Sequence, residues 1–300
     1  MTEPNNETPK TRRKKSVSLM KRFRYNKAAL ASLIILFIIF FVTIFAPVFA
    51  TYDPGRGVLS ERLKGPSLSP SARGGPPHYM GTDQQGRDIF SRLIYGARVS
   101  LTVGFTVAII GGIIGIIMGL LAGYFGGWAD MIIMRMVDVW ASSPTLLIAL
   151  TFVMILGPGQ KNLIIALLIN SWTLYCRMAR SQVLIIRNSA MVESGHAIGA
   201  GNLRIVFLHI MPNIISPLIT TFVMELAHFI IAEVNLSFLG FGVQPPTPSW
   251  GLMIGEGRQY ITNGWWIVLF PGILIGITVI CLNLVGNWVR EEFDPLAVKM

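Results

Sequence analysis

Six long apolar stretches, separated by polar segments, dominate the pattern of hydrophobic and polar positions along this chain. A helix needs about 20 apolar residues to cross the roughly 30 Å hydrocarbon core of a bilayer. Pro144, Pro217 and Pro271 are expected to kink or interrupt the helices that contain them. The pattern predicts an all-α membrane protein with six transmembrane helices, at residues 28–50, 99–123, 131–157, 162–178, 213–240 and 265–287.

The composition excludes most other classes of protein. Of the 300 residues, 52% are hydrophobic and 13% are charged, whereas about 25% are charged in a typical soluble domain. A water-soluble fold of this size cannot bury so much apolar surface, so a soluble enzyme and a disordered regulator are excluded. The two cysteines, Cys176 and Cys281, lie in or beside apolar stretches and imply no disulfide framework.

Positive charge is concentrated at the N-terminus. The net charge is +10, and residues 1–27 hold nine of the 25 lysines and arginines. A basic run that ends at an apolar segment is typical of a cytoplasmic flank beside anionic lipid, so we expect a lipid partner and no nucleic acid. With the N-terminus inside, the cytoplasmic segments hold 16 Lys and Arg residues and the external segments nine, which predicts that both termini are cytoplasmic.

A cleaved signal peptide is the alternative interpretation of the first apolar stretch, because Val48, Phe49 and Ala50 form a passable cleavage site. The apolar core of a signal peptide has about 7–15 residues, however, and this stretch is longer. We therefore expect a retained transmembrane helix.

The predicted organisation places three long connections between the helices, at 51–98, 179–212 and 241–264. Connections are usually short, so function is expected in these segments. The full division is a basic cytoplasmic tail (1–27), a first transmembrane helix (28–50), an external loop with an amphipathic helix (51–98), a five-helix core (99–287) and a cytoplasmic C-terminal tail (288–300).

The external loop ends in a polar segment with helical spacing. Thr82 and Gln85 fit a helix capping box. Asp83 and Arg87, like Asp88 and Arg92, are spaced for ion pairs on one helix face. The segment predicts an amphipathic helix at the external surface, which serves either as a docking platform or as an anchor for the loop.

The second apolar stretch carries a glycine every four residues. Such a stripe lets another helix approach closely, either in static packing or in an interface that slides. The predicted helix-packing residues are Gly111, Gly115, Gly119, Gly123 and Gly127.

The inner loop 179–212 predicts a short helix outside the membrane. Asn188 or Ser189 can cap it, and Glu193 then lies in its first turns, where a carboxylate is favoured. Glycines at 199 and 201 end this helix, and a second short helix leads to Pro212. Composition alone allows two interpretations of this short helix equally well. It either docks into a groove on another protein, or it is an ordinary surface helix.

This segment resembles the EAA loop of ABC-importer permeases, whose pattern is Glu-Ala-Ala, three residues, Gly, nine residues, Ile, any residue and Leu-Pro. Glu193, Gly199 and Pro212 stand at the matching positions. The departures are Ser194 and Gly195 for the two alanines, His209 for Ile and Met211 for Leu. Gly195 weakens the helix by up to about 1 kcal/mol relative to alanine.

The resemblance covers about residues 25–295, and its motifs occur in the order of the dipeptide/oligopeptide family of permeases. It is closest to the second permease subunit type. The motifs are Gly81-Thr82-Asp83, Gly86-Arg87-Asp88, Ser91-Arg92-Leu93, Tyr95-Gly96-Ala97-Arg98, Ser100-Leu101, Ala122-Gly123-Tyr124-Phe125-Gly126-Gly127, Leu236-Ser237-Phe238-Leu239-Gly240 and Pro245-Pro246-Thr247-Pro248-Ser249-Trp250-Gly251.

This resemblance implies an ABC type I importer permease fold in a bacterial inner membrane. The implied partners are a homologous permease subunit, cytoplasmic ATPase subunits and an external substrate-binding protein. The short helix becomes the coupling helix that enters the ATPase groove. Its contact candidates are Glu193, Ser194, Gly195, His196, Ala197 and Gly199.

We expect no catalytic site or bound cofactor in this chain. A P-loop ends in Gly-Lys-Ser/Thr, which the nearest candidate, residues 157–162, lacks. ATP and Mg²⁺ are therefore expected to be used by the partner subunits. No local spacing brings two of the four histidines together as metal ligands, and no Gly-x-Ser-x-Gly nucleophile motif is present.

Charged residues inside the apolar stretches are costly and usually face a cavity or a partner. At 100° per residue, Glu225, His228 and Glu233 fit a face about 140° wide. This face either lines the substrate pathway, where it would meet the cationic amino end of a peptide, or pairs with another helix. Arg135 and Asp138 are spaced to pair with each other.

The predicted function is half of a transmembrane pathway for di- and oligopeptides, driven by ATP. The same machine carrying nickel or a metal chelate, glutathione or an opine remains an alternative, because the binding protein does most of the selecting in this family. A nucleotide-independent channel is an alternative from another class, and an intramembrane enzyme is disfavoured because no catalytic pair is visible.

Overall fold

The computed structural model describes residues 26–71 and 74–293, and regular structure in this part of the chain is helical. Most of the predicted basic N-terminal tail and the end of the C-terminal tail lie outside the described residues. The helices are α2 (Lys27–Ile44), α3 (Ala46–Phe49), η1 (Leu59–Glu61), α4 (Ile89–Phe125), α5 (Gly127–Ala141), α6 (Thr145–Leu156), α7 (Gln160–Arg187), α8 (Ala190–Ala197), α9 (Asn202–Ile205), η2 (Val206–Ile210), α10 (Met211–Phe238), α11 (Trp250–Gly257), η3 (Arg258–Tyr260) and α12 (Trp266–Phe293).

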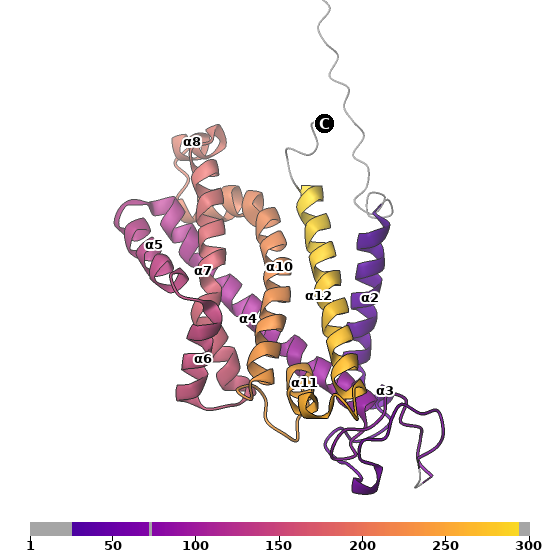
Figure 1. Cartoon of the computed structure of the whole chain (residues 1–300). Helices are drawn as coiled ribbons and strands as arrows, with labels where there is room; N and C mark the ends of the chain where they lie inside the picture. The colour runs from indigo at the N-terminus through magenta and orange to yellow at the C-terminus, as the bar shows by residue number, and fades with distance from the viewer. Residues whose placement is uncertain (1–25, 72–73, 294–300) are drawn as a thin grey trace, which may run out of the picture.

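The long helices form a bundle that α4 crosses obliquely (Figure 1). α2 packs beside α12, and α10 packs against α12, α4 and α7. The start of α2, the end of α12 and α8 lie at one end of the bundle, here named the α8 end. The segment 51–88 and α11 lie at the other end, named the α11 end.

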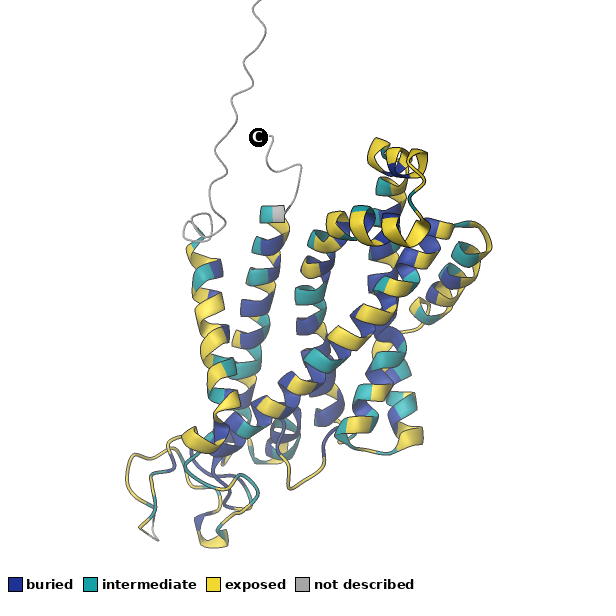
Figure 2. Ribbon diagram, turned by 180° about the vertical axis from the view of Figure 1, so that it is seen from behind, coloured by how far each residue is buried: buried dark blue, intermediate teal, exposed yellow. Residues whose placement is uncertain are grey.

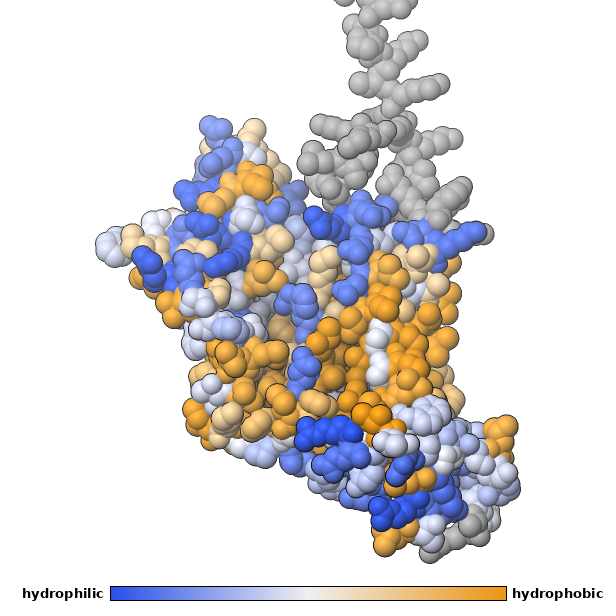
Figure 3. Space-filling view, viewed as in Figure 1, coloured by the Kyte–Doolittle hydropathy of each residue, from blue (hydrophilic) through white to orange (hydrophobic). Residues whose placement is uncertain are grey.

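The surface of the bundle is that of a membrane protein. Side chains exposed along α2, α12 and α4 are mostly large and hydrophobic, and the exposed face of each helix is visible in Figure 2. In Figure 3 hydrophobic residues cover the middle of the molecule over α12 and α2, with hydrophilic residues gathered at the α8 end and over segment 51–88. Hydrocarbon therefore suits the middle of the molecule and water suits both ends.

Four helices of the described chain are long and apolar enough to cross a membrane: α2, α4, the continuous helix Asn202–Phe238, and α12. α5 and α6 qualify together as a fifth, broken span. α7 has 28 residues but is too polar to qualify. The predicted count of six spans is thus not confirmed by length and composition.

Prolines act differently in the three predicted positions. The third predicted helix is broken at residues 142–144, where α5 and α6 meet at 84°. Pro144 stands at the start of α6, where a proline costs least because the first helical N–H groups have no intrahelical partner. Pro217 and Pro271 lie inside α10 and α12, so neither proline interrupts its helix.

Four of the five predicted packing glycines lie where α4 meets α7. A Cβ atom at Gly111, Gly115, Gly119 or Gly123 would fall within 3.0 Å of an atom of α7. Only a residue without a side chain allows this approach of two backbones. Gly127 does not belong to the stripe, because α4 ends at Phe125 and Gly127 begins α5 with φ +54° and open space beside it.

The predicted amphipathic helix in the external loop is wrong. α4 begins only at Ile89, and its N-terminal cap is Asp88, whose carboxylate accepts a hydrogen bond from the backbone N–H of Ser91 (2.8 Å). Thr82 lies in the preceding loop and bonds backbone oxygens there. The polar residues of this segment are mostly buried, because they bind one another and α11 instead of facing solvent.

Asp83, Arg87, Arg92 and Glu256 form a buried arginine–carboxylate cluster at the α11 end. Asp83 Oδ2 lies 2.6 Å from Arg87 Nε and 2.8 Å from Arg92 Nη1. Glu256 Oε2 lies 2.8 Å from each arginine. The pKa of the Glu256 carboxyl is raised, chiefly by burial, and Arg87 opposes part of this shift, so the negative charge of Glu256 depends on Arg87 remaining in place.

We predict that Gly115→Ala destabilises the protein by about 1–3 kcal/mol, because the added methyl group forces α4 away from α7. The matched control is Gly276→Ala on α12, where a Cβ meets nothing within 4 Å, and which is expected to be neutral or stabilising by up to about 1 kcal/mol. Thermal melting of both purified variants in detergent measures the difference. Equal melting temperatures would contradict the packing role of the stripe.

Glu256→Gln is expected to cost about 3 kcal/mol of stability, since it leaves two buried arginines without a full counter-charge. The control is Asp53→Asn, which breaks the exposed Asp53–Arg56 pair and is expected to cost less than about 1 kcal/mol. Denaturation midpoints of the two purified variants provide the comparison. A loss of stability no larger than that of the control would show that the cluster contributes little.

Candidate functional site

The first candidate site is α8, which projects from the α8 end of the bundle (Figure 1). Val192 attaches the buried face of α8 to the bundle. Its side chain is 2% exposed and packs in a hydrophobic cluster with Ile205 and Val206. Gly195 is also buried, because it rests on the side chain of Ile205. The remaining predicted contact residues are exposed: Glu193, Ser194, His196, Ala197 and Gly199.

Local backbone chemistry sets both ends of α8. Ser189 is the N-terminal cap of α8, but its side chain makes no capping hydrogen bond. Its backbone carbonyl oxygen accepts hydrogen bonds from the N–H groups of Val192 (3.0 Å) and Glu193 (3.1 Å). Asn188 belongs to the end of α7 instead. Gly199 adopts φ +76° and its N–H donates to the carbonyl of His196 (2.9 Å), so a residue that tolerates the left-handed region is required there.

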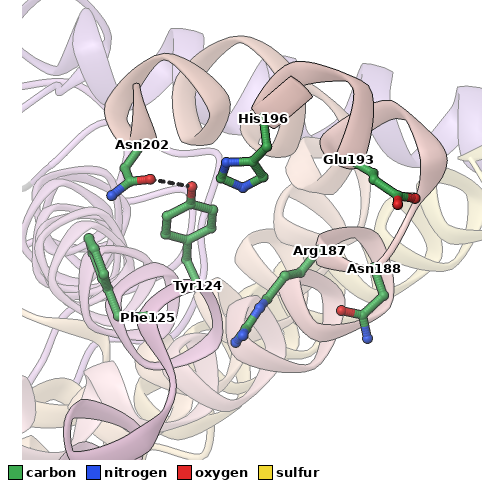
Figure 4. Close-up of a pocket in the computed structure, with 7 residues that line it drawn as sticks. All are labelled: Tyr124, Phe125, Arg187, Asn188, Glu193, His196 and Asn202. Atoms are coloured by element: carbon green, nitrogen blue, oxygen red, sulfur yellow. Dashed lines mark hydrogen bonds between the residues drawn. The ribbon is translucent and has the colours of Figure 1, made fainter. Parts of the chain in front are cut away.

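A cavity of about 590 Å³ lies between α8, the end of α4 and the end of α7. In Figure 4 Glu193 and His196 of α8 stand on one side of it and Tyr124 and Arg187 on others. The Tyr124 hydroxyl donates a hydrogen bond to Asn202 Oδ1 of α9 (3.0 Å). This bond ties the end of α4 directly to the segment that carries α8.

A second tie joins α4 to α7 at the same end. Arg187 Nη1 donates to the backbone oxygen of Gly123 (3.3 Å), near the end of α4. A cation is favoured there because the last carbonyls of a helix lack intrahelical donors. Tyr124 lies within a motif that the sequence singled out, but its partner Asn202 is 78 residues away, so sequence reasoning did not identify the bond.

The second candidate site is a cavity of about 440 Å³ between α6, α7 and α10. Glu225 and His228 line it and bind each other, with 3.0 Å between Oε1 and Nδ1. Glu233 does not join them. Its side chain is fully buried, where it accepts a hydrogen bond from Ser237 (2.6 Å), so Glu233 does not line this cavity with the other two residues.

The other predicted intramembrane pair is also wrong. Asp138 pairs with Arg177 of α7 (2.9 Å) and not with Arg135. Arg180, one turn further along α7, binds Asp130 of α5, with Nη2 2.7 Å from Oδ2. These contacts between α5 and α7 explain why α7 carries arginines within the bundle. Among the described residues, no group of three His, Cys, Asp or Glu side chains is arranged to hold a metal ion.

The fold is shared with a permease of known structure. A chain of the MetNI methionine ABC transporter, in an inward-facing conformation, superposes with a TM-score of 0.56 at 19% identity, covering 68% of this chain and 97% of that chain. This likeness concerns the fold alone. It agrees with the predicted all-α architecture.

Sequence comparison identifies much nearer relatives. The dipeptide transport system permease protein DppC of Escherichia coli is 42% identical over 276 residues, which cover 91% of this chain and 90% of that protein. The di/tripeptide transport system permease protein DppC of Pseudomonas aeruginosa is 41% identical, with 91% and 89% covered. The glutathione transport system permease protein GsiD of Escherichia coli is 38% identical, with 92% and 88% covered.

Two family models cover most of the chain. Residues 18–66 match the N-terminal TM domain of oligopeptide transport permease C. Residues 115–299 match the binding-protein-dependent transport system inner membrane component. Both matches agree with the resemblance carried by the motifs of the sequence. The chain therefore belongs to the family of inner membrane components of binding-protein-dependent transport systems.

Proposed function

We propose that this chain forms half of the transmembrane pathway of an ATP-driven importer of di- and oligopeptides. The observation that carries the proposal is the likeness to dipeptide permeases at about 40% identity along nine-tenths of the chain. The other half of the pathway is a homologous permease subunit. An external binding protein delivers the peptide, and separate ATPase subunits, which use ATP and Mg²⁺, supply the energy. The chain itself catalyses no reaction.

The α8 end faces the cytoplasm in this proposal. α2 begins at that end with Lys27, the last residue of the basic run in the sequence, and such a run is expected on the cytoplasmic side beside anionic lipid. α8 is the surface that the ATPase subunits hold. Its exposed residues Glu193, His196 and Ala197 supply a charge, a polar ring and a small side chain around which a groove can close, while Val192 and Gly195 fix the helix to the bundle.

Movement of α8 reaches the bundle by two routes. Asn202–Phe238 is a continuous helix that begins next to α8 and extends into the membrane as α10. The Tyr124–Asn202 bond transmits the same displacement to α4. Rigid helices joined in this way convert closure of the ATPase subunits into alternation between outward-facing and inward-facing states.

The substrate pathway in this proposal includes Glu225 and His228, which line the cavity between α6, α7 and α10. Glutathione is the second candidate cargo, because a glutathione permease is 38% identical over nearly the same length. Glutathione also carries a free ammonium group and peptide bonds, so the same cavity suits it.

The proposal predicts that the complete complex in proteoliposomes takes up dialanine only when ATP is present. Glu193→Lys is expected to reduce both ATPase association and uptake at least about tenfold, because it reverses the charge that α8 presents. Co-purification and initial uptake rates are the measurements. ATP-independent flux through the wild-type complex would favour a channel and contradict the proposal.

Gly195→Ala is the matched control on the same helix. A Cβ at Gly195 lies at an ordinary contact distance of 3.6 Å from Ile205, so it fits, and alanine favours the helix. This variant should associate and transport at least as well as the wild type. If Glu193→Lys did the same, α8 would not be the coupling surface.

Tyr124→Phe removes one hydroxyl and its bond to Asn202. We predict that it lowers the number of peptides imported per ATP hydrolysed by about two- to tenfold, which corresponds to the free energy of one hydrogen bond, while ATPase association is unchanged. The control is Tyr79→Phe, at an exposed position in segment 51–88. An unaltered transport stoichiometry in Tyr124→Phe would exclude this bond from the transmission of movement.

A further inference from the structure

The cavity that contains Glu225 lies beside the break between α5 and α6. Its wall includes Ala141 at the end of α5, Ser143 within the break and Thr145 at the start of α6. Non-helical backbone at membrane depth is tolerated where it lines a cavity, because backbone polar groups there need water or a ligand. Broken helices beside solute sites are a recurring feature of transporters for this reason.

The size and lining of this cavity suit a small polar solute. Its volume of about 440 Å³ lies within the 300–1,000 Å³ of typical small-molecule sites. Polar side chains reach it from three helices: Thr145 of α6, Asn170 and Thr173 of α7, and Glu225, His228 and Asn235 of α10. A cavity in an apolar bundle that only met lipid would not need so many hydrogen-bonding groups.

The charge of the lining favours a cation. Among the described residues that line the cavity, Glu225 is the one acidic side chain and none is lysine or arginine. Glu225 Oε1 binds His228, while Oε2 has no hydrogen-bond partner among the described residues. An ammonium group can therefore bind the second oxygen without displacing the histidine.

The Glu225–His228 pair is not a structural link between helices. Both residues belong to α10, three positions apart, and the His228 side chain is 71% exposed. The pair therefore holds no second helix in place, unlike the Asp138–Arg177 pair, which joins α5 to α7. Within the described chain, this geometry favours the interpretation that the pair lines a pathway over the interpretation that it links two helices.

Two amide side chains complete the site. Asn170 is 8% exposed and its Nδ2 donates to Thr145 Oγ1 (2.8 Å), which fixes the amide in the wall. The Asn235 side chain is exposed and makes no hydrogen bond within the described residues. Carboxamide groups offer both a donor and an acceptor, as the N–H and C=O of a peptide bond require.

We infer that this cavity is a transit site for peptides with a free amino terminus. Glu225 binds the α-ammonium group, and Asn170 and Asn235 bind the peptide backbone. The site thus binds the ammonium group and the backbone amides, which all peptides with a free amino terminus share, whatever their side chains. This inference rests on the proposed function, and it adds the chemical group of the cargo that the permease itself recognises.

The test uses the complete complex in proteoliposomes, with radiolabelled dialanine as the probe. Glu225→Asp, Glu225→Gln and Glu225→Lys form a charge series at one position. Uptake should fall in that order, at least about tenfold for Gln, as expected when a hydrogen bond to a charged group is lost, and to background for Lys. ATP hydrolysis stimulated by the loaded binding protein should stay near the wild-type level in all three, because α8 is unaltered.

The matched control is Glu291→Gln, at an exposed position near the end of α12 and outside the cavity, which should leave uptake unchanged. Wild-type uptake of dialanine by Glu225→Lys would overturn the inference while leaving the proposed function intact. Failure of the wild-type complex to import dialanine would instead overturn the proposed function. If the Glu225 variants do not assemble, Asn235→Leu tests the same inference. Reduced dialanine uptake with normal stimulated ATP hydrolysis would support the transit site, and normal uptake would refute it.

Discussion

The close approach of α4 and α7 is the contact on which the other features of this structure depend. Lipid tails are as apolar as leucine side chains, so the hydrophobic effect does not hold membrane helices together, and close packing must do so. Glycines from Gly111 to Gly123 supply that packing by leaving no side chain between the two backbones. The contact also shelters α7, which is too polar to qualify as a membrane span by its own composition.

Because α4 is continuous, it joins the two ends of the molecule. Its 37 residues correspond to roughly 55 Å of helix. Arg92, in its first turn, belongs to the buried cluster that includes Glu256 of α11, and Tyr124, in its last turn, bonds to Asn202 beside α8. A displacement at the α8 end therefore reaches the α11 end without passing through a loop.

The proposed ATPase-binding surface on α8 and the proposed transit site are connected by the same helices as well. One wall of the cavity is α10, which is continuous with the segment that carries α8. Another part of the wall is the break between α5 and α6, and α5 follows α4 directly after Gly126. Both parts of the wall are thus connected to α8, the proposed coupling helix, which is the arrangement needed to open and close a site from one end.

The sequence determined the features that depend on neighbours along the chain: the apolar helices, the break at Pro144, the glycine stripe up to Gly123 and the short helix that ends just before Gly199. Spacing also identified the Asp83–Arg87 ion pair, but it did not determine the partners that charged residues find far away in the sequence. Spacing suggested that Asp138 pairs with Arg135, but Asp138 binds Arg177, 39 residues away. Spacing also suggested that Glu233 lines the same pathway as Glu225, but Glu233 is buried away from the cavity. Arg92 likewise binds Glu256, 164 residues away. Periodicity specifies which residues share a face of one helix, whereas the group that meets that face is chosen by the packing of helices remote in sequence, and this only the tertiary structure decides.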